Sequence, residues 1–484
     1  MATLSLCMIV KNEARFLPGC LKSIRNVVDE IVIVDTGSTD ETVKIAKQFG
    51  AKVHHFDWNN SFAEARNEAI RYATSDYILW MDADERLNKG DVRQLSFLKQ
   101  RLPSEKDIAY AVEILNYRQG RWPESAFQTR IFPNLPGIEF RGDICEQISF
   151  SLAERGVKFE VSRVKIRHLG YLTSQIWQAK IQRNLPFLKK ALKERVATGE
   201  FSWDIHYYLG MSYLNLNELW LAQEHLMQVL NEDCRFKNPF FYISAAVHLS
   251  DLLQKEGESH QALQILLKLK NEFPHNDFVL YHLGNLFFQQ EDFQKAIETL
   301  SQCRPENIQL GIVPVSKRDY VFNYYETLGF CYEALNEIEE AIYMFKRALG
   351  VKSRALGLMA HLSSILLFKT NKTEEATSYL IKGIKLAEKE GIPTKGQEIY
   401  IALCLMLAVV LAKQCRIEEC VFVAERLLKS INLPATKVIH KLDELIGIYQ
   451  DIGENLKEKG FIWANLAFET AKGLKELPDY AEKK

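Results

Sequence analysis

Residues 80–85 read WMDADE, and an unbroken apolar run that begins at Tyr77 leads into them. Uninterrupted large apolar residues are typical of a strand covered on both faces, and parallel strands of this kind end at the ligand-binding edge of an α/β sheet. Asp82 and Asp84 are therefore expected in one turn at that edge. Two carboxylates in one turn repel each other unless a cation lies between them, so the turn predicts a divalent metal site. A solvated acidic loop is the alternative.

Strands and helices alternate in the residues before this turn. Apolar runs predict strands, and apolar residues at a helical spacing predict a helix over residues 16–28. The expected strands span residues 4–10, 31–34, 51–56 and 77–81. Helices between parallel strands form right-handed crossovers, so we expect the carboxyl ends of the strands to meet at one edge of the sheet. Asn12, Asp35 and Asp82 then share one cleft.

Two S-x-x-E sequences mark expected helix starts. Ser38 with Glu41, and likewise Ser61 with Glu64, have the spacing of a capping box. The sequence has neither GxGxxG after the first strand nor GxxxxGK[ST], which argues against dinucleotide-binding and P-loop proteins. A flavodoxin-like or Rossmann domain would bring the same strand ends together.

Four sequence blocks in this region resemble the family 2 glycosyltransferases, which have the GT-A fold. The blocks are MIVKNE at 8–13, DTGSTDET at 35–42, FAEARNEAI at 62–70 and DADE at 82–85. The resemblance covers residues 4–170 and implies inverting transfer from a nucleotide sugar. It implies that Asp35, near Asn12, contacts the nucleotide base, usually uracil. It also implies that Asp82 and Asp84 hold Mg²⁺ or Mn²⁺ on the donor diphosphate.

The chemistry of such a transfer calls for these residue types. A departing nucleoside diphosphate gathers negative charge as the glycosidic bond breaks, and a divalent cation stabilises that charge as a Lewis acid. Arg66, in the helix expected after the third strand, offers a fork of donors to a phosphate group. A surface arginine on that helix is the alternative.

Three further residues are candidates on the acceptor and metal sides. Residues 137–148, GIEFRGDICEQI, resemble the segment that holds the general base in tetratricopeptide-bearing members of the family. The resemblance implies that Glu146 is the general base, with Asp143 as the second candidate, and Cys145 stands where those members commonly have histidine. His168, in the block HLGY, resembles the position where a histidine completes the metal shell, and imidazole is a competent Mn²⁺ ligand. Solvated turn residues and a structural histidine are the alternatives.

Beyond residue 107 the helices between strands are expected to disappear. Residues 108–117, 125–132 and 157–166 read as strands. The sequence therefore predicts an antiparallel extension of the sheet that builds the acceptor side.

The second half of the chain is helical and repetitive. A connector helix is expected at residues 174–198, and residues 399–412 are expected as a buried helix. Leu-Gly pairs that start at 209, 283 and 328 are followed, twelve residues after the glycine, by Ala222, Ala296 and Ala341. Further copies are expected around Ala262, Ala376 and Cys420. Small residues at these positions let two helices approach closely, which is the tetratricopeptide pattern and predicts a helical solenoid.

Composition and charge are those of an ordinary globular protein. The 484 residues suggest about two to four domains, and a net charge of -1 gives no reason to expect nucleic acid or an anionic membrane as a partner. Nine cysteines without a CxxC pair are expected to be reduced thiols, which indicates a cytoplasmic protein. No signal peptide and no membrane span are expected, because the longest apolar run is too short.

These observations define a predicted architecture and activity. The expected parts are a GT-A domain over residues 1–172, a helical connector over 173–200, tetratricopeptide-like repeats over 201–477 and a tail over 478–484. The predicted activity is metal-dependent, inverting glycosyl transfer from a nucleotide sugar, with UDP favoured, to a peptide or protein that the repeats recruit. The architecture resembles that of bacteriocin- and flagellin-modifying glycosyltransferases, including the sublancin type. Alternatives are a cell-envelope saccharide or lipid-linked acceptor, a non-catalytic repeat scaffold, and a homodimer formed through the repeats.

Overall fold

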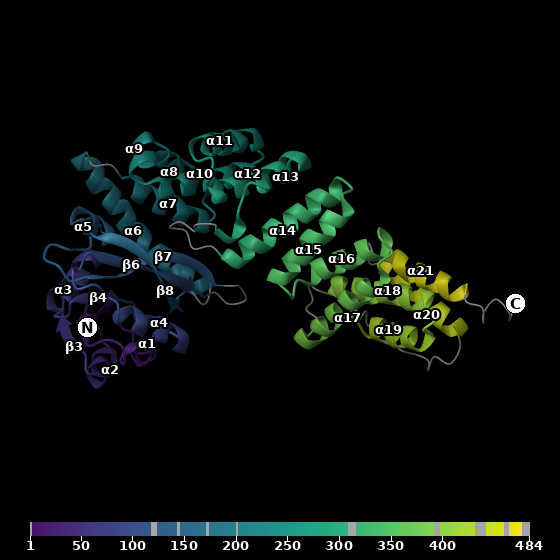
Figure 1. The fold of residues 1–484 in the computed structure, drawn as a ribbon, viewed down its shortest axis with the longest axis horizontal. Helices are drawn as coiled ribbons and strands as arrows, with labels where there is room; N and C mark the ends of the chain where they lie inside the picture. The colour runs from purple at the N-terminus through teal and green to yellow at the C-terminus, as the bar shows by residue number, and fades with distance from the viewer. Residues whose placement is uncertain are drawn as a thin grey trace. The chain divides into compact units, whose positions relative to one another are not determined.

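The computed structural model describes residues 2–117, 123–142, 146–170, 174–199, 202–307, 316–391, 397–430, 442–458 and 464–476. An α/β part is followed by helices (Figure 1). Internal contacts divide the chain into two compact units, Met1–Leu286 with Ser301–Tyr320, and Phe287–Leu300 with Val321–Lys484. Asp143, Cys145 and the predicted tail lie outside the described residues. The α/β part therefore shares a unit with the first helices that follow it.

Four parallel strands form the first half of the sheet, in the order β3-β2-β1-β4. They are β1 (Leu4–Val10), β2 (Glu30–Asp35), β3 (Lys52–His55) and β4 (Tyr77–Trp80), connected by α1 (Leu17–Ile24), α2 (Thr42–Gln48) and α3 (Phe62–Tyr72). The register pairs Val10 with Asp35 and Cys7 with Trp80. The predicted alternation, with all four strands running in one direction, is therefore confirmed.

Strand β4 is covered on both faces, as its apolar run predicts. Tyr77 and Leu79 belong to one buried cluster, whereas Ile78 and Trp80 belong to a second cluster on the other face of the sheet. Because both faces of the strand are apolar, its first polar side chains appear in the turn that follows it. The acidic turn is thus confined to the edge of the sheet.

The two S-x-x-E sequences have different outcomes. Ser61 caps α3, and its hydroxyl accepts a hydrogen bond from the backbone N–H of Glu64 at 3.2 Å. The prediction at Ser38 is wrong, because Glu41 is itself the N-cap of α2 and makes no side-chain cap bond. The Ser38 hydroxyl instead accepts from the backbone N–H of Asn12 at 3.0 Å. This bond ties the loop after β1 to the loop after β2.

The second half of the sheet is mixed. Strands β7 (Glu124–Pro133) and β6 (Ile108–Asn116) continue it in the predicted antiparallel manner. Strand β8 (Lys158–His168) runs parallel to β6, so the prediction of an antiparallel extension without helices is wrong there. A parallel neighbour requires a crossover connection, and helix α5 (Ser149–Glu154) lies in that connection. The short strand β5 (Glu85–Arg86) pairs antiparallel with β8, and α4 (Lys89–Lys99) follows it.

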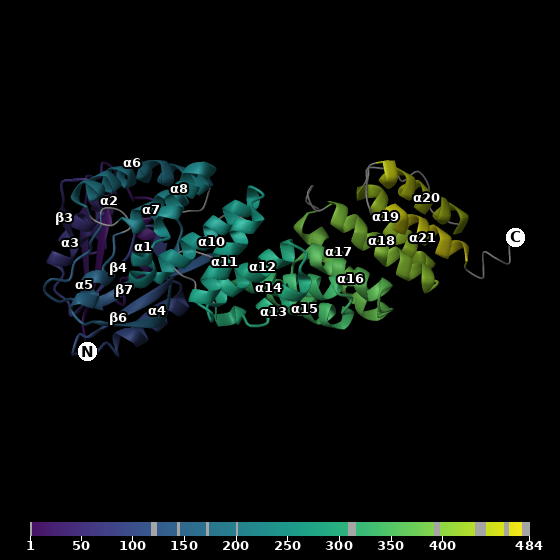
Figure 2. The same cartoon turned by 90° about the horizontal axis from the view of Figure 1, so that it is seen from above.

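The rest of the described chain is helical, and several pairs of consecutive helices pack against each other (Figure 2). The connector α6 (Ser174–Thr198) has the predicted bounds. Extensively packed pairs are α7 (Trp203–Asn215) with α8 (Leu219–Val229), α10 (Pro239–Lys255) with α11 (Ser259–Glu272), α16 (Leu356–Phe368) with α17 (Thr373–Glu390), α18 (Gln397–Lys413) with α19 (Ile417–Ser430), and α20 (Leu442–Glu458) with α21 (Ala464–Lys475). The other helices are α9 (Glu232–Lys237), α12 (Asp277–Gln289), α13 (Phe293–Leu300), α14 (Lys317–Ala334) and α15 (Ile338–Val351), with a 3₁₀ turn at Pro305–Asn307.

The small residues of the predicted repeats lie at helix contacts. Those that are completely buried are Ala222, Ala262, Ala296, Ala341, Ala376 and Cys420. A Cβ atom at Gly210 would lie 2.8 Å from the Leu226 side chain on the paired helix, and one at Gly329 would overlap the ring of Phe345. The predicted repeat pattern is therefore confirmed in the packing of the helices.

Helix α18 contains the longest apolar run of the chain, and residues 400–412 within it are all buried. Most of them belong to one buried cluster together with side chains of α17, α19, α20 and α21. The predicted buried helix is confirmed. No helix in the described ranges has the length and apolar character needed to cross a membrane.

Replacing Gly329 with alanine is expected to destabilise the repeats. The new methyl group would overlap Phe345, and overpacking of a core costs about 1–3 kcal/mol. Gly447 is the matched control, because a Cβ there meets no atom within 4 Å. Gly447→Ala should stabilise α20 by roughly 0.5–1 kcal/mol, since glycine is a poor helix former. Urea unfolding followed by circular dichroism measures the free energy of unfolding of both variants. A change of the same sign in both variants would contradict the packing described for Gly329.

Candidate active site

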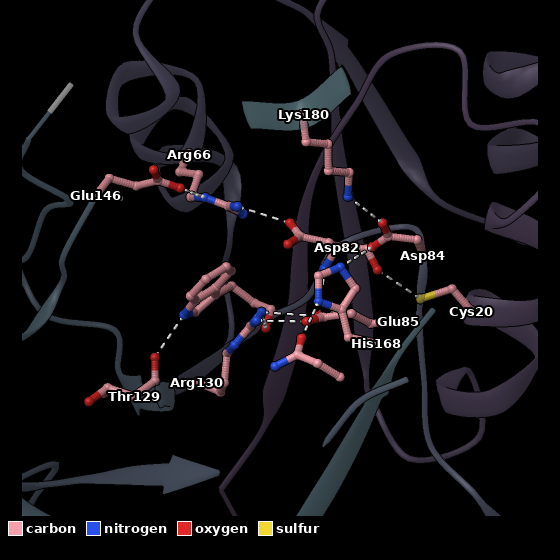
Figure 3. A network of polar contacts seen from close by, with 12 residues as sticks. Cys20, Arg66, Asp82, Asp84, Glu85, Thr129, Arg130, Glu146, His168 and Lys180 are labelled. Atoms are coloured by element: carbon pink, nitrogen blue, oxygen red, sulfur yellow. Dashed lines mark hydrogen bonds and ion pairs between the residues drawn. The ribbon is translucent and has the colours of Figure 1, made fainter. Parts of the chain in front are cut away.

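A buried ion pair holds the turn after β4. The Glu85 carboxylate accepts two hydrogen bonds from the Arg130 guanidinium, at 3.1 and 2.7 Å, and another from the backbone N–H of Asp82 at 2.8 Å (Figure 3). Arg130 also donates to the backbone oxygen of Trp80 at 3.3 Å. Both charged side chains are almost fully buried. These bonds fix the conformation of the turn that carries the predicted metal ligands.

Trp80 lies against two arginines. The guanidinium carbons of Arg66 and Arg130 lie 4.1 and 3.5 Å from the centre of the indole ring system. The indole N–H donates to the backbone oxygen of Thr129 at 2.8 Å. A guanidinium stacked on an aromatic ring keeps its N–H groups in its own plane for acidic partners. Each arginine therefore forms an ion pair with one acid of the turn. Arg130 pairs with Glu85, and Arg66 pairs with Asp82.

Arg66 joins two of the predicted site residues. Its Nη2 donates to Asp82 Oδ1 at 2.9 Å, and its Nε donates to Glu146 Oε1 (Figure 3). Arg66 is buried, and the Glu146 side chain is only 10% exposed. Arg66 thus links Glu146, the predicted general base, to Asp82, a predicted residue of the donor site. The role of Arg66 toward a phosphate group stays a prediction, and Asp143 lies among the residues that are not described.

Asp84 lies between a histidine and a lysine. His168 Nε2 is 3.3 Å from Asp84 Oδ1, and Lys180 Nζ donates to Asp84 Oδ2 at 3.3 Å (Figure 3). Two of the predicted metal ligands, Asp84 and His168, are therefore adjacent. The third, Asp82, points toward Arg66.

Strand pairing produces this neighbourhood. In the register of β5 with β8, Glu85 is opposite His168, and the backbone N–H of Leu169 donates to the backbone oxygen of Asp84 at 3.0 Å. A Cβ atom at Gly170 would overlap Asp84 Oδ2. The glycine after His168 is therefore needed for β8 to approach the acidic turn this closely.

Burial and nearby cations act in opposite directions on the acids of the turn. Burial by itself would raise the pKa of Asp82, but the charges of Arg66, Arg130 and His168 together outweigh it and hold that pKa below the usual range. Burial also opposes ionisation of Asp84, but His168 and Lys180 together outweigh it and lower the Asp84 pKa. Burial, followed by the charge of Asp84, raises the pKa of Glu13 to about 7. Asp82 and Asp84 are therefore ionised at neutral pH, whereas Glu13 titrates there.

Asn12 and Asp35 shape the loops at the same edge of the sheet. Asn12 has a left-handed backbone with φ of 55°, and its side-chain oxygen accepts from the backbone N–H of Thr39 at 2.8 Å. The buried Asp35 carboxylate accepts from the backbone N–H groups of Gly37 and Ser38 at 3.2 and 3.1 Å. The contacts of both residues with a nucleotide stay predictions.

The chemistry around Asp84 fits a divalent cation. His168 Nδ1 faces the side-chain oxygen of Asn116 at 2.9 Å, so Nδ1 carries a proton and Nε2 is the ring nitrogen that faces Asp84. Asp84 Oδ1 is buried, and His168 Nε2 lies 3.3 Å from it. A proton on Nε2 stabilises this carboxylate, and a divalent cation bound between the two atoms would take the place of that proton. No three His, Cys, Asp or Glu side chains of the described chain form a metal cluster, so a cation here would need water or phosphate oxygens as further ligands.

Several residues at the site were not predicted. Glu13 and Glu85 belong to the sequence blocks KNE and DADE, so a signal for them was present. Arg130 and Lys180 had no such signal, because they lie 45 residues from Glu85 and 96 residues from Asp84 in sequence. Their involvement follows from strand pairing and from the docking of α6.

The family model described as glycosyl transferase family 2 matches residues 5–111, which include Asn12, Asp35, Arg66, Asp82 and Asp84. This region is a family 2 glycosyltransferase domain. A tetratricopeptide repeat model matches residues 278–304, which contain most of α12 and all of α13. The predicted combination of a GT-A domain with helical repeats is therefore confirmed.

Two relatives extend the comparison. A TPR repeat-containing protein of Synechococcus elongatus is 32% identical over 269 residues, 54% of this chain and 64% of that protein. The SPbeta prophage-derived glycosyltransferase SunS of Bacillus subtilis is 26% identical over 310 residues, 63% of this chain and 71% of SunS. The match thus spans less than two thirds of the first relative. A solved structure of MamA from Desulfovibrio magneticus is 15% identical with a TM-score of 0.32, covers 40% of this chain and 97% of MamA, and supports no inference.

Proposed function

We propose that the chain is a metal-dependent, inverting glycosyltransferase that moves a sugar from a nucleotide sugar, with UDP favoured, to a peptide or protein. The observation that carries the proposal is the turn after β4, where Asp82 and Asp84 stand among Arg66, His168 and Lys180. Interleaved acids and cations at the edge of a parallel sheet suit a ligand that brings both a diphosphate and a bound cation. The family match supports the same reaction class.

The donor side of the proposed site lies on the acidic turn. Asp84 and His168 are the proposed cation ligands, with Asp82 beside them on the same turn. A bound Mg²⁺ or Mn²⁺ ion supplies a Lewis acid that stabilises the charge of the departing nucleoside diphosphate. The loops shaped by Asn12 and Asp35 are the proposed place of the nucleotide base.

Glu146 is the proposed base on the acceptor side. Arg66 holds its carboxylate, and the side chain is mostly buried, so its position relative to the acidic turn is well defined. A hydroxyl acceptor has to lose its proton as the new bond forms, whereas a thiol with a pKa of about 8.5 is already partly ionised and needs a weaker base. The chemistry of the acceptor therefore decides how strongly transfer depends on Glu146.

The helical repeats are proposed to recruit the acceptor. The match to the tetratricopeptide model, together with the similarity to a TPR repeat-containing protein and to a glycosyltransferase, supports this role. We place the catalytic domain at residues 1–172, the connector at 173–200 and the repeats at 201–477, in a protein that acts in the cytoplasm. The alternative is that the repeats form a homodimer and do not recruit the acceptor.

Release of nucleotide tests the proposal. The full-length protein is incubated with a panel of nucleotide sugars, Mn²⁺ and candidate peptide acceptors, and released nucleoside diphosphate and acceptor mass are measured. Nucleotide release together with addition of one sugar to a peptide supports the proposal. A requirement for a saccharide or lipid-linked acceptor would move the assignment to that acceptor class. Absence of turnover with every nucleotide sugar would leave only a binding scaffold.

Replacing Glu146 with glutamine is expected to slow transfer to a hydroxyl acceptor by about 10²–10⁴-fold, because a general base contributes a factor of this size. The matched control is Glu154→Gln, which removes a 61% exposed carboxylate of α5. Single-turnover kinetics with serine- and cysteine-containing peptides measures the effect, which should be smaller for cysteine. Unchanged rates with both peptides would exclude Glu146 as the base.

A further inference from the structure

Lys180 lies outside the residues that match the glycosyltransferase family, yet its side chain reaches the acidic turn. It belongs to α6, and its Nζ donates to Asp84 Oδ2 at 3.3 Å (Figure 3). The lysine side chain is 29% exposed, whereas Arg66 is buried. A partly exposed ammonium on a flexible stem can change its partner without disrupting a core. Lys180 is therefore the more adaptable of these two cations.

The helix that carries Lys180 is anchored in the repeats. Leu188 and Ala191, about two and three turns further along α6, are buried in one cluster with Leu209 of α7 and Ala222 of α8. The acidic turn, α6 and this first helix pair all belong to the same compact unit. Packing of the repeat core thus sets the position from which Lys180 reaches Asp84.

The charges around Asp84 restrict what can bind there. Its carboxylate already has Lys180 and His168 as cationic or hydrogen-bonding neighbours. A divalent cation on Asp84 would lie close to the Lys180 ammonium, and like charges at such distances repel strongly in a partly buried site. A diphosphate brings negative charge to the same place and offers the ammonium another partner.

We propose that Lys180 exchanges partners when the donor binds: it holds Asp84 in the unliganded protein and moves to the donor diphosphate when the nucleotide sugar and the divalent cation arrive. This inference rests on the proposed function. It adds to that function a residue of the connector helix that binds the diphosphate of the nucleotide sugar. The donor site is complete only with α6 in place. Cation and nucleotide consequently bind with positive coupling, because each removes an obstacle to the other.

The substitution Lys180→Ala tests the exchange, and Lys180→Met, which keeps the aliphatic stem, is a second variant. Lys190→Ala is the matched control, because Lys190 lies on the same helix, is 66% exposed and pairs with Glu194. Binding of Mn²⁺ alone to the full-length protein is measured by electron paramagnetic resonance. Binding of UDP, and in parallel of GDP, is measured by calorimetry at saturating Mn²⁺.

Both Lys180 variants are expected to bind Mn²⁺ alone about ten-fold more tightly and the nucleotide about ten-fold more weakly than the unchanged protein, since a charge-assisted contact contributes a factor of about ten or more. Lys190→Ala should change neither affinity. An unchanged affinity for Mn²⁺ or for the nucleotide in both Lys180 variants, with normal binding by the unchanged protein, would overturn the exchange and leave the proposed function intact. If the unchanged protein binds neither Mn²⁺ nor a nucleoside diphosphate, the proposed function and the exchange both fail.

Discussion

Asp84→Asn is expected to lower the rate of nucleotide release by about 10³-fold. The amide keeps the size of the side chain and removes the charge that would hold a divalent cation. A Lewis acid at the leaving group contributes several kcal/mol, and about 1.4 kcal/mol corresponds to each factor of ten in rate. Asp84 is also the shared partner of His168 and Lys180, so the substitution removes the acid that lies between these two side chains. Steady-state kinetics over a range of Mn²⁺ concentrations measures the loss.

The matched control for this experiment is Asp107→Asn. Asp107 is 40% exposed, directly precedes β6 and pairs with Lys158 at the surface. This control should retain full turnover. Partial rescue of Asp84→Asn at high Mn²⁺ would indicate a weakened cation site. Full activity of Asp84→Asn at every Mn²⁺ concentration would exclude Asp84 as a metal ligand.

Arg130→Met is expected to destabilise the glycosyltransferase domain by about 3–5 kcal/mol, because it leaves the Glu85 carboxylate buried without its partner. The backbone oxygen of Trp80 loses a hydrogen bond in the same substitution. Urea unfolding followed by tryptophan fluorescence measures the change, since Trp80 lies against Arg130. The acidic turn should lose its fixed conformation, so nucleotide release should fall as well.

Two further variants separate the causes of this loss. Lys158→Met breaks an ion pair whose lysine is 75% exposed, and it should cost no more than about 1 kcal/mol. The double variant Glu85→Met with Arg130→Met leaves no unpaired buried charge, so it should recover most of the stability. Its nucleotide release should stay low, because the backbone N–H of Asp82 loses the Glu85 carboxylate as its acceptor in this variant. A double variant as unstable as Arg130→Met would contradict the assignment of the loss to the unpaired charge.

The parallel strands were predictable because their signals are local. The apolar run before the acidic turn is interpretable without knowledge of its neighbours, and β4 is indeed buried on both faces. The cap at Ser61 is equally local, since donor and acceptor are three residues apart. Ser38 has the same spacing to Glu41, but its hydroxyl is taken by the backbone N–H of Asn12, 26 residues away. A competing tertiary partner is the reason why this local signal failed.

The direction of β8 was not predictable in the same way. Its apolar alternation is compatible with either pairing, and β8 is parallel to β6 because the chain passes from β7 to the far side of β6 before β8 begins. The direction of β8 also determines the composition of the candidate site, because it places His168, at the end of β8, opposite Glu85 on β5. The prediction that His168 lies near the acidic turn therefore depended on the family resemblance and not on the pattern of strands.

Residue types and their order along the chain were sufficient to predict the α/β domain, the acidic pair at the end of β4 and the helical repeats, because each depends on the hydrophobic periodicity and spacing of nearby residues. The partners of the acids depended on folding: Asp82 is paired with Arg66, and Asp84 lies between His168 and Lys180. Buried charges require partners, and distance along the chain does not indicate which cation is closest in space. The connection from the repeats to the acidic turn, through Lys180 of α6, therefore became visible only in three dimensions.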